Sequence, residues 1–358
     1  MKILITAPSL DPKRNVSGIS SVVLSIIQNS KQEYFHYTLG KADNASSKIK
    51  RIFNTIKSLL LFPIFLKRNR IDLVHDNLPF NPKGMVREAI IILWSRLLSV
   101  PILLHVHGGE YLMKKCSNPI LLFIIRFIFS SVKKVIVLSE IEKLSIKNLY
   151  NVDSEVLYNA VDTNFYKPLR SREEGEKKTI IFIGRLHESK GLEDLLAAFK
   201  MLYPKKPFRF ILCGEGNLKA NIVNTLSSFM GDDFEYKGVV SGDQKRNIIQ
   251  NADIFVLPSR YGEGLPISLL EAMSCGLIPI TTDDASMKFI IKDGVNGFFV
   301  EKKNSYDLEH KLLKVITLPS SFYENISKNA RESITEKYNL EKFIANLEAN
   351  YNSIKKVI

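Results

Sequence analysis

Short apolar, β-branched runs alternate with longer amphipathic stretches along the whole chain of 358 residues. This alternation is typical of βαβ units, in which a helix connects two parallel strands of one sheet. Helices are expected near Ile19–Gln28 and Leu192–Leu202. Strands are expected in two sets, at Lys2–Thr6, Leu73–His75, Ile102–Val106 and Lys134–Leu138, and at Thr179–Ile183, Arg209–Cys213, Ile254–Leu257 and Ile278–Thr281. The pattern therefore predicts an α/β protein with two doubly wound sheets.

A connector separates the two sets of strands. It runs from Asn159 to Pro168 and is followed by a charged run from Arg170 to Lys178. Since a domain commonly takes 100–200 residues, the length also favours two domains. We predict an N-terminal domain over residues 1–165, a C-terminal domain over 166–340, and a terminal helix over 341–358. That helix packs back on the N-terminal domain or stays with the second one.

Several classes of protein are excluded by simple counts. Three cysteines, Cys116, Cys213 and Cys275, have no paired spacing, so we expect neither a disulfide framework nor a cysteine zinc site. The longest apolar stretch, Pro119–Ser131, contains Arg126 and is shorter than the roughly 20 residues that span a bilayer. The apolar run before Pro8 is too short for a signal peptide. We expect a cytoplasmic protein without a transmembrane helix.

The charge is uneven, because residues 1–165 carry +10 of the net charge of +13. A basic half can indicate nucleic acid, an anionic membrane surface or only a lysine-favouring genome. No helix-turn-helix, zinc-finger or RNA-recognition pattern is present, and the basic excess is spread over a long segment. A nucleic-acid-binding protein is therefore the weakest alternative, and no nucleic-acid partner is expected.

Two loops that follow strands carry the chemistry. The first, Gly184–Gly191, holds Arg185 and Lys190 and runs into a helix, whose N-terminus attracts anions. Together they would suit a diphosphate, although two solvated loop charges are the simpler interpretation. The second loop places Glu263 before Pro266, which suits the first turn of a helix. Glu271 follows about one and a half turns into that helix.

The carboxylates of Glu263 and Glu271 are natural acceptors for the vicinal hydroxyls of a sugar or a ribose. Taken singly, one could be a turn residue and the other an exposed helical glutamate. The Gly-Glu-Gly-Leu-Pro context around Glu263 makes a joint role more plausible, since glycines allow a ligand to approach the backbone closely.

Five segments in register resemble the retaining glycosyltransferases of the GT-B fold, in the group-4 family (glycosyl transferases group 1). They are NAVDTNFYKP at 159–168, GRLHESKG at 184–191, CGEG at 213–216, ADIFVLPSRYGEGLPISLLEAM at 252–273 and DGVNGFFV at 293–300. The resemblance implies two Rossmann-like doubly wound domains that face each other across a cleft. It further implies that the N-terminal domain binds the acceptor and that the C-terminal domain binds the nucleotide-sugar donor.

The resemblance also assigns roles to residues of the C-terminal domain. Arg185 and Lys190 look like the pair that holds the donor diphosphate and stabilises the leaving nucleotide. Glu263 looks like the carboxylate that binds the donor sugar, and Glu271 looks like the ribose ligand. The remaining donor-binding positions are Gly184, at the start of the GRLHESKG loop, and Gly214 and Gly216, which let the chain pass near the nucleotide. Gly264 and Leu265 offer backbone N–H groups, and Val239 lies within Lys237–Val240, near the base.

In the N-terminal domain the family has a glycine-rich loop after the first strand. Ser17-Gly18-Ile19-Ser20 matches it, with Ser17 where a second glycine is usual, so Gly18 is the candidate. His107 is similar to a histidine that contacts the donor sugar in the family. His105 is its rival, because residues two apart on a strand share one face.

The implied activity is transfer of a sugar from a UDP- or GDP-sugar to a saccharide or lipid-linked saccharide, with retention of the anomeric configuration. No Asp-x-Asp sequence occurs, so we expect neither a metal nor another cofactor, with Arg185 and Lys190 replacing a divalent ion. The family's commonest bacterial use suggests envelope polysaccharide, such as O-antigen, capsule or exopolysaccharide. A nucleotide-sugar 2-epimerase on the same architecture is the runner-up.

Two segments of the basic domain, Lys57–Arg70 and Lys114–Lys134, mix apolar residues with Lys and Arg, as interfacial segments do. They indicate either peripheral contact with an anionic membrane, at the inner face of the plasma membrane, or core helices. The sequence leaves both interpretations open.

Overall fold

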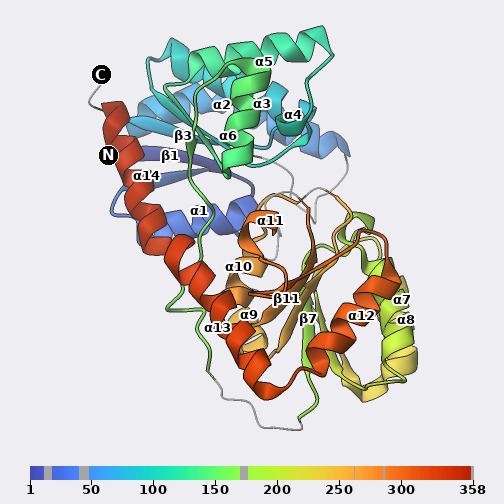
Figure 1. Cartoon of the computed structure of the whole chain (residues 1–358). Coiled ribbons are helices and arrows are strands. Elements are labelled where there is room, and N and C mark those ends of the chain that lie inside the picture. Colours follow the sequence, from blue (N-terminus) through green and yellow to red (C-terminus); the bar gives the residue numbers. More distant parts are fainter. Residues whose placement is uncertain (12–17, 40–47, 170–175, 262, 285–286, 356–358) are drawn as a thin grey trace. The chain divides into compact units, whose positions relative to one another are not determined.

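The computed structural model describes residues 1–11, 18–39, 48–169, 176–261, 263–284 and 287–355 (Figure 1). The chain forms two compact units, Met1–Asn159 with Glu341–Ile358, and Ala160–Leu340. The boundary falls after Asn159 rather than after residue 165. The reason is that the connector bonds to the second unit: Val161 N–H donates to the carbonyl of Tyr338, and Ser274 Oγ donates to the carbonyl of Tyr166.

The first unit holds a six-stranded, all-parallel sheet in the order β2-β1-β3-β4-β5-β6. Its elements are β1 (Lys2–Ala7), α1 (Gly18–Asn29), β2 (Glu33–Thr38), α2 (Lys48–Asn69), β3 (Leu73–Leu78), α3 (Pro82–Leu97), β4 (Ile102–Val106), α4 (Glu110–Met113), α5 (Pro119–Ser131), β5 (Lys134–Val137), α6 (Glu140–Tyr150), β6 (Glu155–Val156) and α14 (Leu340–Lys355).

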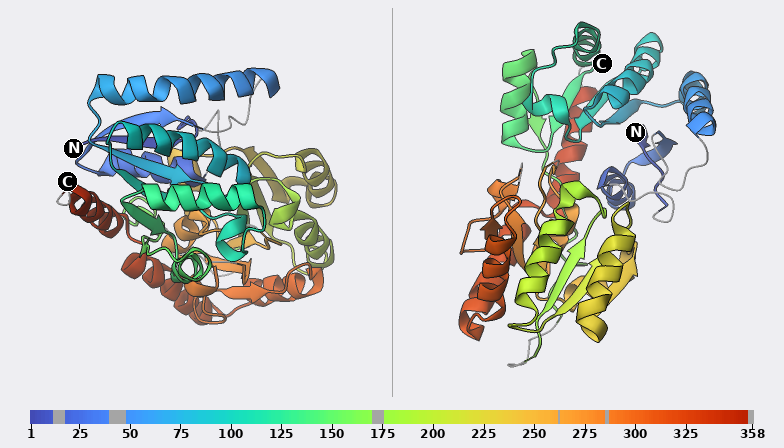
Figure 2. Two further views of the ribbon diagram at one scale, coloured as in Figure 1. Left: turned by 90° about the horizontal axis from the view of Figure 1, so that it is seen from above. Right: turned by 90° about the vertical axis from the view of Figure 1, so that its right-hand side faces the viewer.

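Helices cover both faces of this first sheet. In the first unit, α2, α3 and α5 lie next to one another on one face, and α1 lies on the other (Figures 1 and 2). The residues that face α2, α3 and α5, such as Leu4, Val74 and Leu104, are fully buried in one apolar cluster. Tyr351 of α14 packs on the opposite face, where its hydroxyl lies 2.7 Å from Nδ1 of His75.

The second unit contains another parallel six-stranded sheet, in the order β12-β11-β10-β7-β8-β9. Numbered within the unit, this is the 3-2-1-4-5-6 order of a Rossmann fold. Its elements are β7 (Thr179–Ile183), the 3₁₀ turn η1 (Glu188–Lys190), α7 (Leu192–Leu202), β8 (Arg209–Cys213), α8 (Lys219–Met230), η2 (Gly231–Asp233), β9 (Phe234–Gly238), α9 (Gly242–Gln250), β10 (Ile254–Leu257), α10 (Ile267–Ser274), β11 (Ile278–Thr282), α11 (Met287–Ile290), β12 (Phe298–Val300), α12 (Ser305–Ile316) and α13 (Ser320–Lys337).

The predicted class of two doubly wound α/β sheets is confirmed, and every predicted strand is present. The three cysteines are buried and free, as expected. Within the described parts of the chain, no helix combines the length and the apolar character needed to cross a bilayer.

Candidate functional site

The order of the second sheet reverses between β7 and β10, which are neighbours although two strands separate them in sequence. In open α/β sheets, ligands bind beyond the carboxyl ends of the strands at such a reversal. The loop after β7 contains Arg185 and Lys190, and the loop after β10 contains Glu263. Both motifs found in the sequence therefore lie at this reversal.

Lys190 and Glu263 are in direct contact. Lys190 Nζ lies 2.5 Å from Glu263 Oε1, and the two side chains keep only 19% and 7% of their exposure. Ser259 Oγ donates to the same carboxylate oxygen. The main-chain N–H of Glu263 donates to Asp284 Oδ2 over 3.1 Å. Glu263 is thus held by three groups from three loops, two of which the sequence analysis had not singled out.

Arg185 differs from Lys190 in its surroundings. Its side chain is exposed and takes part in no ion pair among the residues that the structure describes. A guanidinium in this state keeps its charge available to an anion, because no carboxylate neutralises it. Of the two cations in this loop, Lys190 is therefore paired with a carboxylate, whereas Arg185 has no ion-pair partner among the described residues.

The helix after this loop is already charge-compensated. Glu193 and Asp194 occupy the first turn of α7, and Arg260 holds both, with Nε and one terminal nitrogen each 2.8 Å from Asp194 and the other 3.0 Å from Glu193. Acidic residues satisfy the partial positive charge of a helix N-terminus. We therefore attribute the attraction for an anion to Arg185 and Lys190 rather than to this helix.

Close packing between loops explains three of the glycines. A Cβ on Gly214 would lie 1.8 Å from the carbonyl oxygen of Gly184, one on Gly216 would lie 2.1 Å from that of Leu186, and one on Gly191 would lie 2.0 Å from that of Pro258. Gly214 and Gly216 thus let the loop after β8 rest against the loop after β7, a reason different from the predicted approach to the nucleotide. By contrast, Gly18 and Gly264 have open space where a Cβ would be.

Glu271 lies on α10 and is also nearly buried, with 6% of its surface exposed. Its carboxylate pairs with Lys245 of α9. The connector contributes Tyr166, whose hydroxyl pKa is raised by burial and by the nearby carboxylate of Glu271. Sequence reasoning found Glu271 but neither partner, because both come from other elements.

The segment predicted to lie near the base, Lys237–Val240, spans the end of β9 and is next to the CGEG segment. Gly214 N–H donates to the carbonyl of Gly238 over 2.7 Å, and Val239, the next residue, is half-buried. Leu265 is buried at the start of the segment that leads into α10. The structure therefore gathers Gly184, Gly214 and Val239 at neighbouring strand ends of the second sheet.

In the first unit, His107 directly follows β4 and is half-buried. Its Nε2 lies 2.7 Å from Oδ1 of Asn77, and its ring centroid lies 4.1 Å from that of His105. Burial lowers the pKa of His107 to about 3, so the ring is neutral at physiological pH. His105 is fully buried between His107 and His75, which leaves His107 as the accessible histidine.

Gly18 is the exposed first residue of α1, and Ser17 lies outside the described residues. Gly18 and His107 belong to the first unit, whereas the other predicted site residues belong to the second. The groups that sequence reasoning missed are Ser259, Asp284, Lys245, Tyr166 and Asn77. Among the described residues, no cluster of three or more His, Cys, Asp or Glu side chains could hold a metal ion.

Two family models together span most of the chain. Residues 167–333 match the glycosyl transferases group 1, and residues 37–165 match Glycosyltransferase Family 4. The chain belongs to the group 1 glycosyltransferases. The first model covers the second unit's sheet with Arg185, Lys190, Glu263 and Glu271, and the other covers His107.

Two glycosyltransferases among the curated relatives match this chain over most of their length. An uncharacterized glycosyltransferase of Methanocaldococcus jannaschii is 28% identical over 86% of this chain and 82% of that protein. The UDP-Gal:alpha-D-GlcNAc-diphosphoundecaprenol alpha-1,3-galactosyltransferase of Escherichia coli is 25% identical over 84% of this chain and 80% of that protein. Putative colanic acid biosynthesis glycosyltransferases also match, over about half of this chain.

Solved structures show the fold. Sucrose-phosphate synthase from Thermosynechococcus elongatus has a TM-score of 0.80 at 16% identity, over 100% of both chains. HepE from Anabaena, solved in complex with UDP-glucose, has a TM-score of 0.75 at 16% identity, over 99% of this chain and 100% of that one. The chain therefore has the same GT-B fold as these structures, as the motifs predicted.

Proposed function

We propose that this glycosyltransferase transfers a sugar from a nucleotide-sugar donor to a saccharide or lipid-linked saccharide, with retention of configuration, in the synthesis of an envelope polysaccharide. The observation that carries the proposal is the contact between Lys190 and Glu263 at the strand reversal of the second sheet. It puts a cation and a carboxylate at the position where an α/β sheet binds its ligand.

The proposed chemistry depends on charge. Breaking the sugar–phosphate bond develops negative charge on the diphosphate, so a group that binds this charge best in the transition state accelerates the reaction. Arg185 is exposed and unpaired within the described chain, and Lys190 lies five residues further along the same loop. In this proposal both stabilise the leaving diphosphate, while Glu263 accepts hydrogen bonds from hydroxyls of the donor sugar.

Glu271 would bind the ribose in the same proposal. Its carboxylate is nearly buried against Lys245, so ribose hydroxyls would have to share it with that ammonium group. The relatives that act in colanic acid synthesis and on a diphosphoundecaprenol-linked sugar support a polysaccharide pathway and a lipid-linked acceptor.

The first test measures thermal stability with UDP, GDP, ADP and their sugar conjugates, without added metal. We expect one nucleotide series to raise the melting temperature of the wild type, because a ligand that binds only the native state stabilises it. The Arg185→Ala variant should lose the shift. Release of that nucleotide should then require an acceptor saccharide, and sugar epimerisation without an acceptor would instead support the 2-epimerase.

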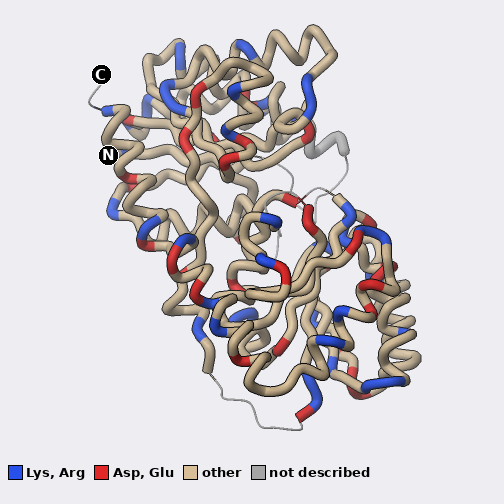
Figure 3. The backbone as a smooth tube through the Cα atoms, in the orientation of Figure 1, with Lys and Arg blue, Asp and Glu red and all other residues tan. Residues whose placement is uncertain are grey.

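We further propose that the outer helices of the first unit contact an anionic membrane. Among the side chains that the structure describes, eleven large apolar ones are exposed there: Ile52, Phe53, Ile56, Leu60, Leu61 and Ile64 on α2, Val86, Leu93 and Leu97 on α3, and Ile120 and Phe123 on α5. The sequences of these helices contain a single acid, Glu88, which is buried, among several Lys and Arg (Figure 3). Apolar side chains flanked by cations suit the surface of anionic lipids.

Only one face of α2 is available for this contact. Phe62 and Phe65 of α2 pack on Tyr37 of β2, with ring centroids 5.1 Å from it in each case. Phe53 and Leu60 are 65% and 63% exposed. The segment Lys57–Arg70 is therefore both a packed helix and an interfacial candidate, which reconciles the two interpretations of the sequence.

Co-sedimentation with vesicles tests this proposal. We expect the wild type to bind phosphatidylglycerol vesicles at low salt, and the double variant Phe53→Ser/Leu60→Ser to bind far less. Phe322→Ser is the matched control, since Phe322 is 63% exposed but lies on α13 of the second unit. Absence of wild-type binding at low salt, or an equal loss in the control, would contradict it.

A further inference from the structure

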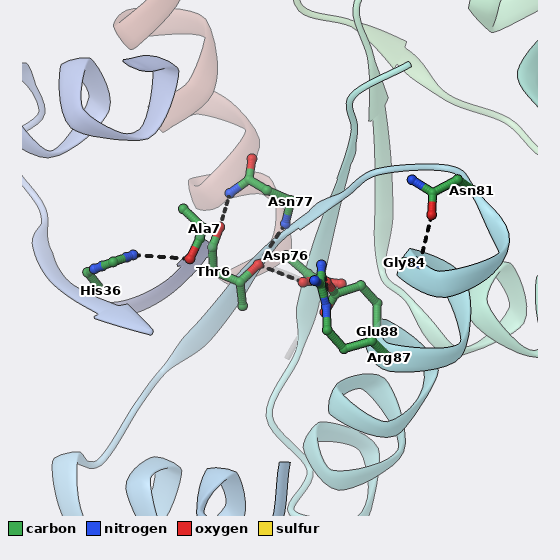
Figure 4. A network of polar contacts seen from close by, with 9 residues as sticks. All are labelled: Thr6, Ala7, His36, Asp76, Asn77, Asn81, Gly84, Arg87 and Glu88. Atoms are coloured by element: carbon green, nitrogen blue, oxygen red, sulfur yellow. Dashed lines mark hydrogen bonds and ion pairs between the residues drawn. The ribbon is translucent and has the colours of Figure 1, made fainter. Parts of the chain in front are cut away.

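A network of buried polar groups connects β1, β3 and α3 with His107. Thr6 lies on β1, Asp76 and Asn77 lie on β3, and Glu88 lies on α3 (Figure 4). Asp76 and Glu88 are fully buried, and Thr6 and Asn77 are 1% and 3% exposed. Buried polar groups cost free energy unless they are hydrogen-bonded, so the donors and acceptors of this network have little freedom.

The amide of Asn77 can point in only one direction. Its nitrogen Nδ2 lies 2.8 Å from the carbonyl oxygen of Thr6, and a carbonyl can only accept. The amide NH₂ must therefore face Thr6, which leaves Oδ1 on the side of His107. Since an amide oxygen only accepts, Nε2 of His107, 2.7 Å away, must carry the hydrogen.

A second pair of bonds fixes the position of Asn77. Its main-chain N–H donates to Thr6 Oγ1 over 2.9 Å, and the hydroxyl of Thr6 donates to Asp76 Oδ1 over 2.7 Å. These bonds hold the backbone and the side chain of Asn77 against β1 together. Asn77 is therefore held at two points, its main-chain N–H and its side-chain Nδ2, in addition to its contact with His107.

Beneath this contact, Asp76 interacts with Glu88, whose carboxylate accepts from Arg87 Nε over 2.8 Å. Burial and the neighbouring Glu88 raise the pKa of Asp76 well above its ordinary value. Burial also raises the pKa of Glu88. Two neighbouring buried carboxyls favour sharing a proton, and Oδ1 of Asp76 accepts from Thr6 in either protonation state.

We propose that Asn77 is a positioning residue that holds His107 in its Nε2–H tautomer, so that Nδ1 presents a lone pair to a hydroxyl of the donor sugar. The contact between Nδ1 and the donor sugar rests on the proposed function, whereas the assignment of the tautomer does not. Which ring nitrogen of a histidine carries the hydrogen is set by the hydrogen bond that the other one makes. With the opposite tautomer, two lone pairs would face each other across 2.7 Å.

The other groups around His107 favour a neutral ring. His105 lies against it, and His75 follows next to His105, with Nε2 3.3 Å from Nδ1 of His105. His75 in turn meets the hydroxyl of Tyr351 on α14. Burial lowers the pKa of all three histidines, to about 3 for His75 and His107. A neutral imidazole is needed, because only then can Nδ1 accept.

Nitrogen NMR of ¹⁵N-histidine-labelled protein, without substrate, tests the tautomer directly. For wild-type His107 we expect Nε2 to carry the hydrogen and Nδ1 to resonate as an unprotonated nitrogen. Asn77→Leu should remove the preference and give a mixture of tautomers. Asn77→Asp should keep it in the pH range where the buried carboxyl is protonated, because one oxygen can then accept from Nε2 while the hydroxyl donates to the carbonyl of Thr6.

A matched control separates positioning from stability. Asn81→Ala removes the side chain that caps α3 by accepting from Gly84 N–H over 3.0 Å, and it does not touch His107. Loss of such a cap lowers stability. We therefore expect Asn81→Ala to melt earlier while its His107 spectrum stays as in the wild type.

Kinetics add a second readout once the donor is known. Asn77→Leu should lower kcat/KM about 10–100-fold, the size of effect seen when a metal-ligating histidine loses its orienting partner, and Asn77→Asp should recover most of it where its carboxyl is protonated. A wild-type spectrum with hydrogen on Nδ1, or an unchanged spectrum in Asn77→Leu, would overturn the inference. A correct tautomer in a protein that transfers no sugar from any donor would instead refute the proposed function.

Discussion

Replacing Lys190 with alanine should lower both the stability and the turnover of the enzyme. The substitution leaves Glu263, with 7% of its side chain exposed, without its cation. Removing one partner of a fully buried pair costs roughly 3–5 kcal/mol, and we expect about 2 kcal/mol here because Lys190 keeps 19% of its exposure. For a unit of this size, that corresponds to a decrease of about 4–8 °C in melting temperature.

The effect on turnover should be separable from the effect on stability. Loss of a group that stabilises developing charge lowers turnover about 10²–10³-fold. In the double variant Lys190→Ala/Glu263→Gln, the buried charge is removed as well, so most of the stability should return. Turnover should not return, because neither the cation nor the carboxylate is available to the donor.

The assay combines melting of the ligand-free protein with the rate of nucleotide release. Lys205→Ala is the control, since Lys205 pairs with Glu309 while 60% of its side chain stays exposed. We expect the control to melt and turn over nearly as the wild type does. If Lys190→Ala melted like the wild type and kept its rate, the reasoning from the Lys190–Glu263 contact would be refuted.

Four further predictions follow from other contacts. Arg185→Ala should lower turnover about 10²–10³-fold without changing the melting temperature, since its side chain is exposed. Glu271→Ala should raise KM for the donor more than it lowers kcat, and an unchanged KM would count against ribose binding. Tyr351→Phe should destabilise by about 1–2 kcal/mol in denaturant unfolding, because it leaves Nδ1 of buried His75 unpaired. Burial raises the pKa of Glu142 from 4.5 to about 7, so its stabilising effect is present below pH 4.5 and is lost as pH rises through 7. Relative to the wild type, Glu142→Gln should thus gain about 2–3 kcal/mol of unfolding free energy between pH 4 and pH 8, and no pH-dependent gain would contradict this.

The interior strands of both sheets could be predicted from sequence, whereas the outermost strands could not. The strands that the sequence did not single out are β2, β6, β9 and β12, which are the edges of the two sheets. Interior parallel strands are buried on both faces and read as continuous apolar runs. β2 and β9 are half-exposed and polar in part, and β6 and β12 have only two and three residues.

The site was predictable only in part, for a related reason. Motif spacing identified Lys190 and Glu263, yet their contact depends on β7 and β10 being neighbours, which no local pattern shows. The same holds for Lys245, which reaches Glu271 from a different helix. The glycines of CGEG were found as a motif. They are required because a Cβ at either position would clash with a carbonyl oxygen of the loop after β7, which the sequence does not show.

The end of β3 shows where sequence rules fail for a functional reason. The predicted strand ended at His75, but the structure extends it through Asp76 and Asn77 to Leu78. Polar side chains are unusual inside a buried parallel strand, because each must find a partner. Here Asp76 meets Thr6 and Glu88, and Asn77 meets Thr6 and His107. A strand that keeps such residues sacrifices apolar burial, and natural sequences break local rules of this kind mainly where function requires it. The violation at Asn77, directly beside His107, is therefore the reason to look for an orienting role there rather than for a purely structural one.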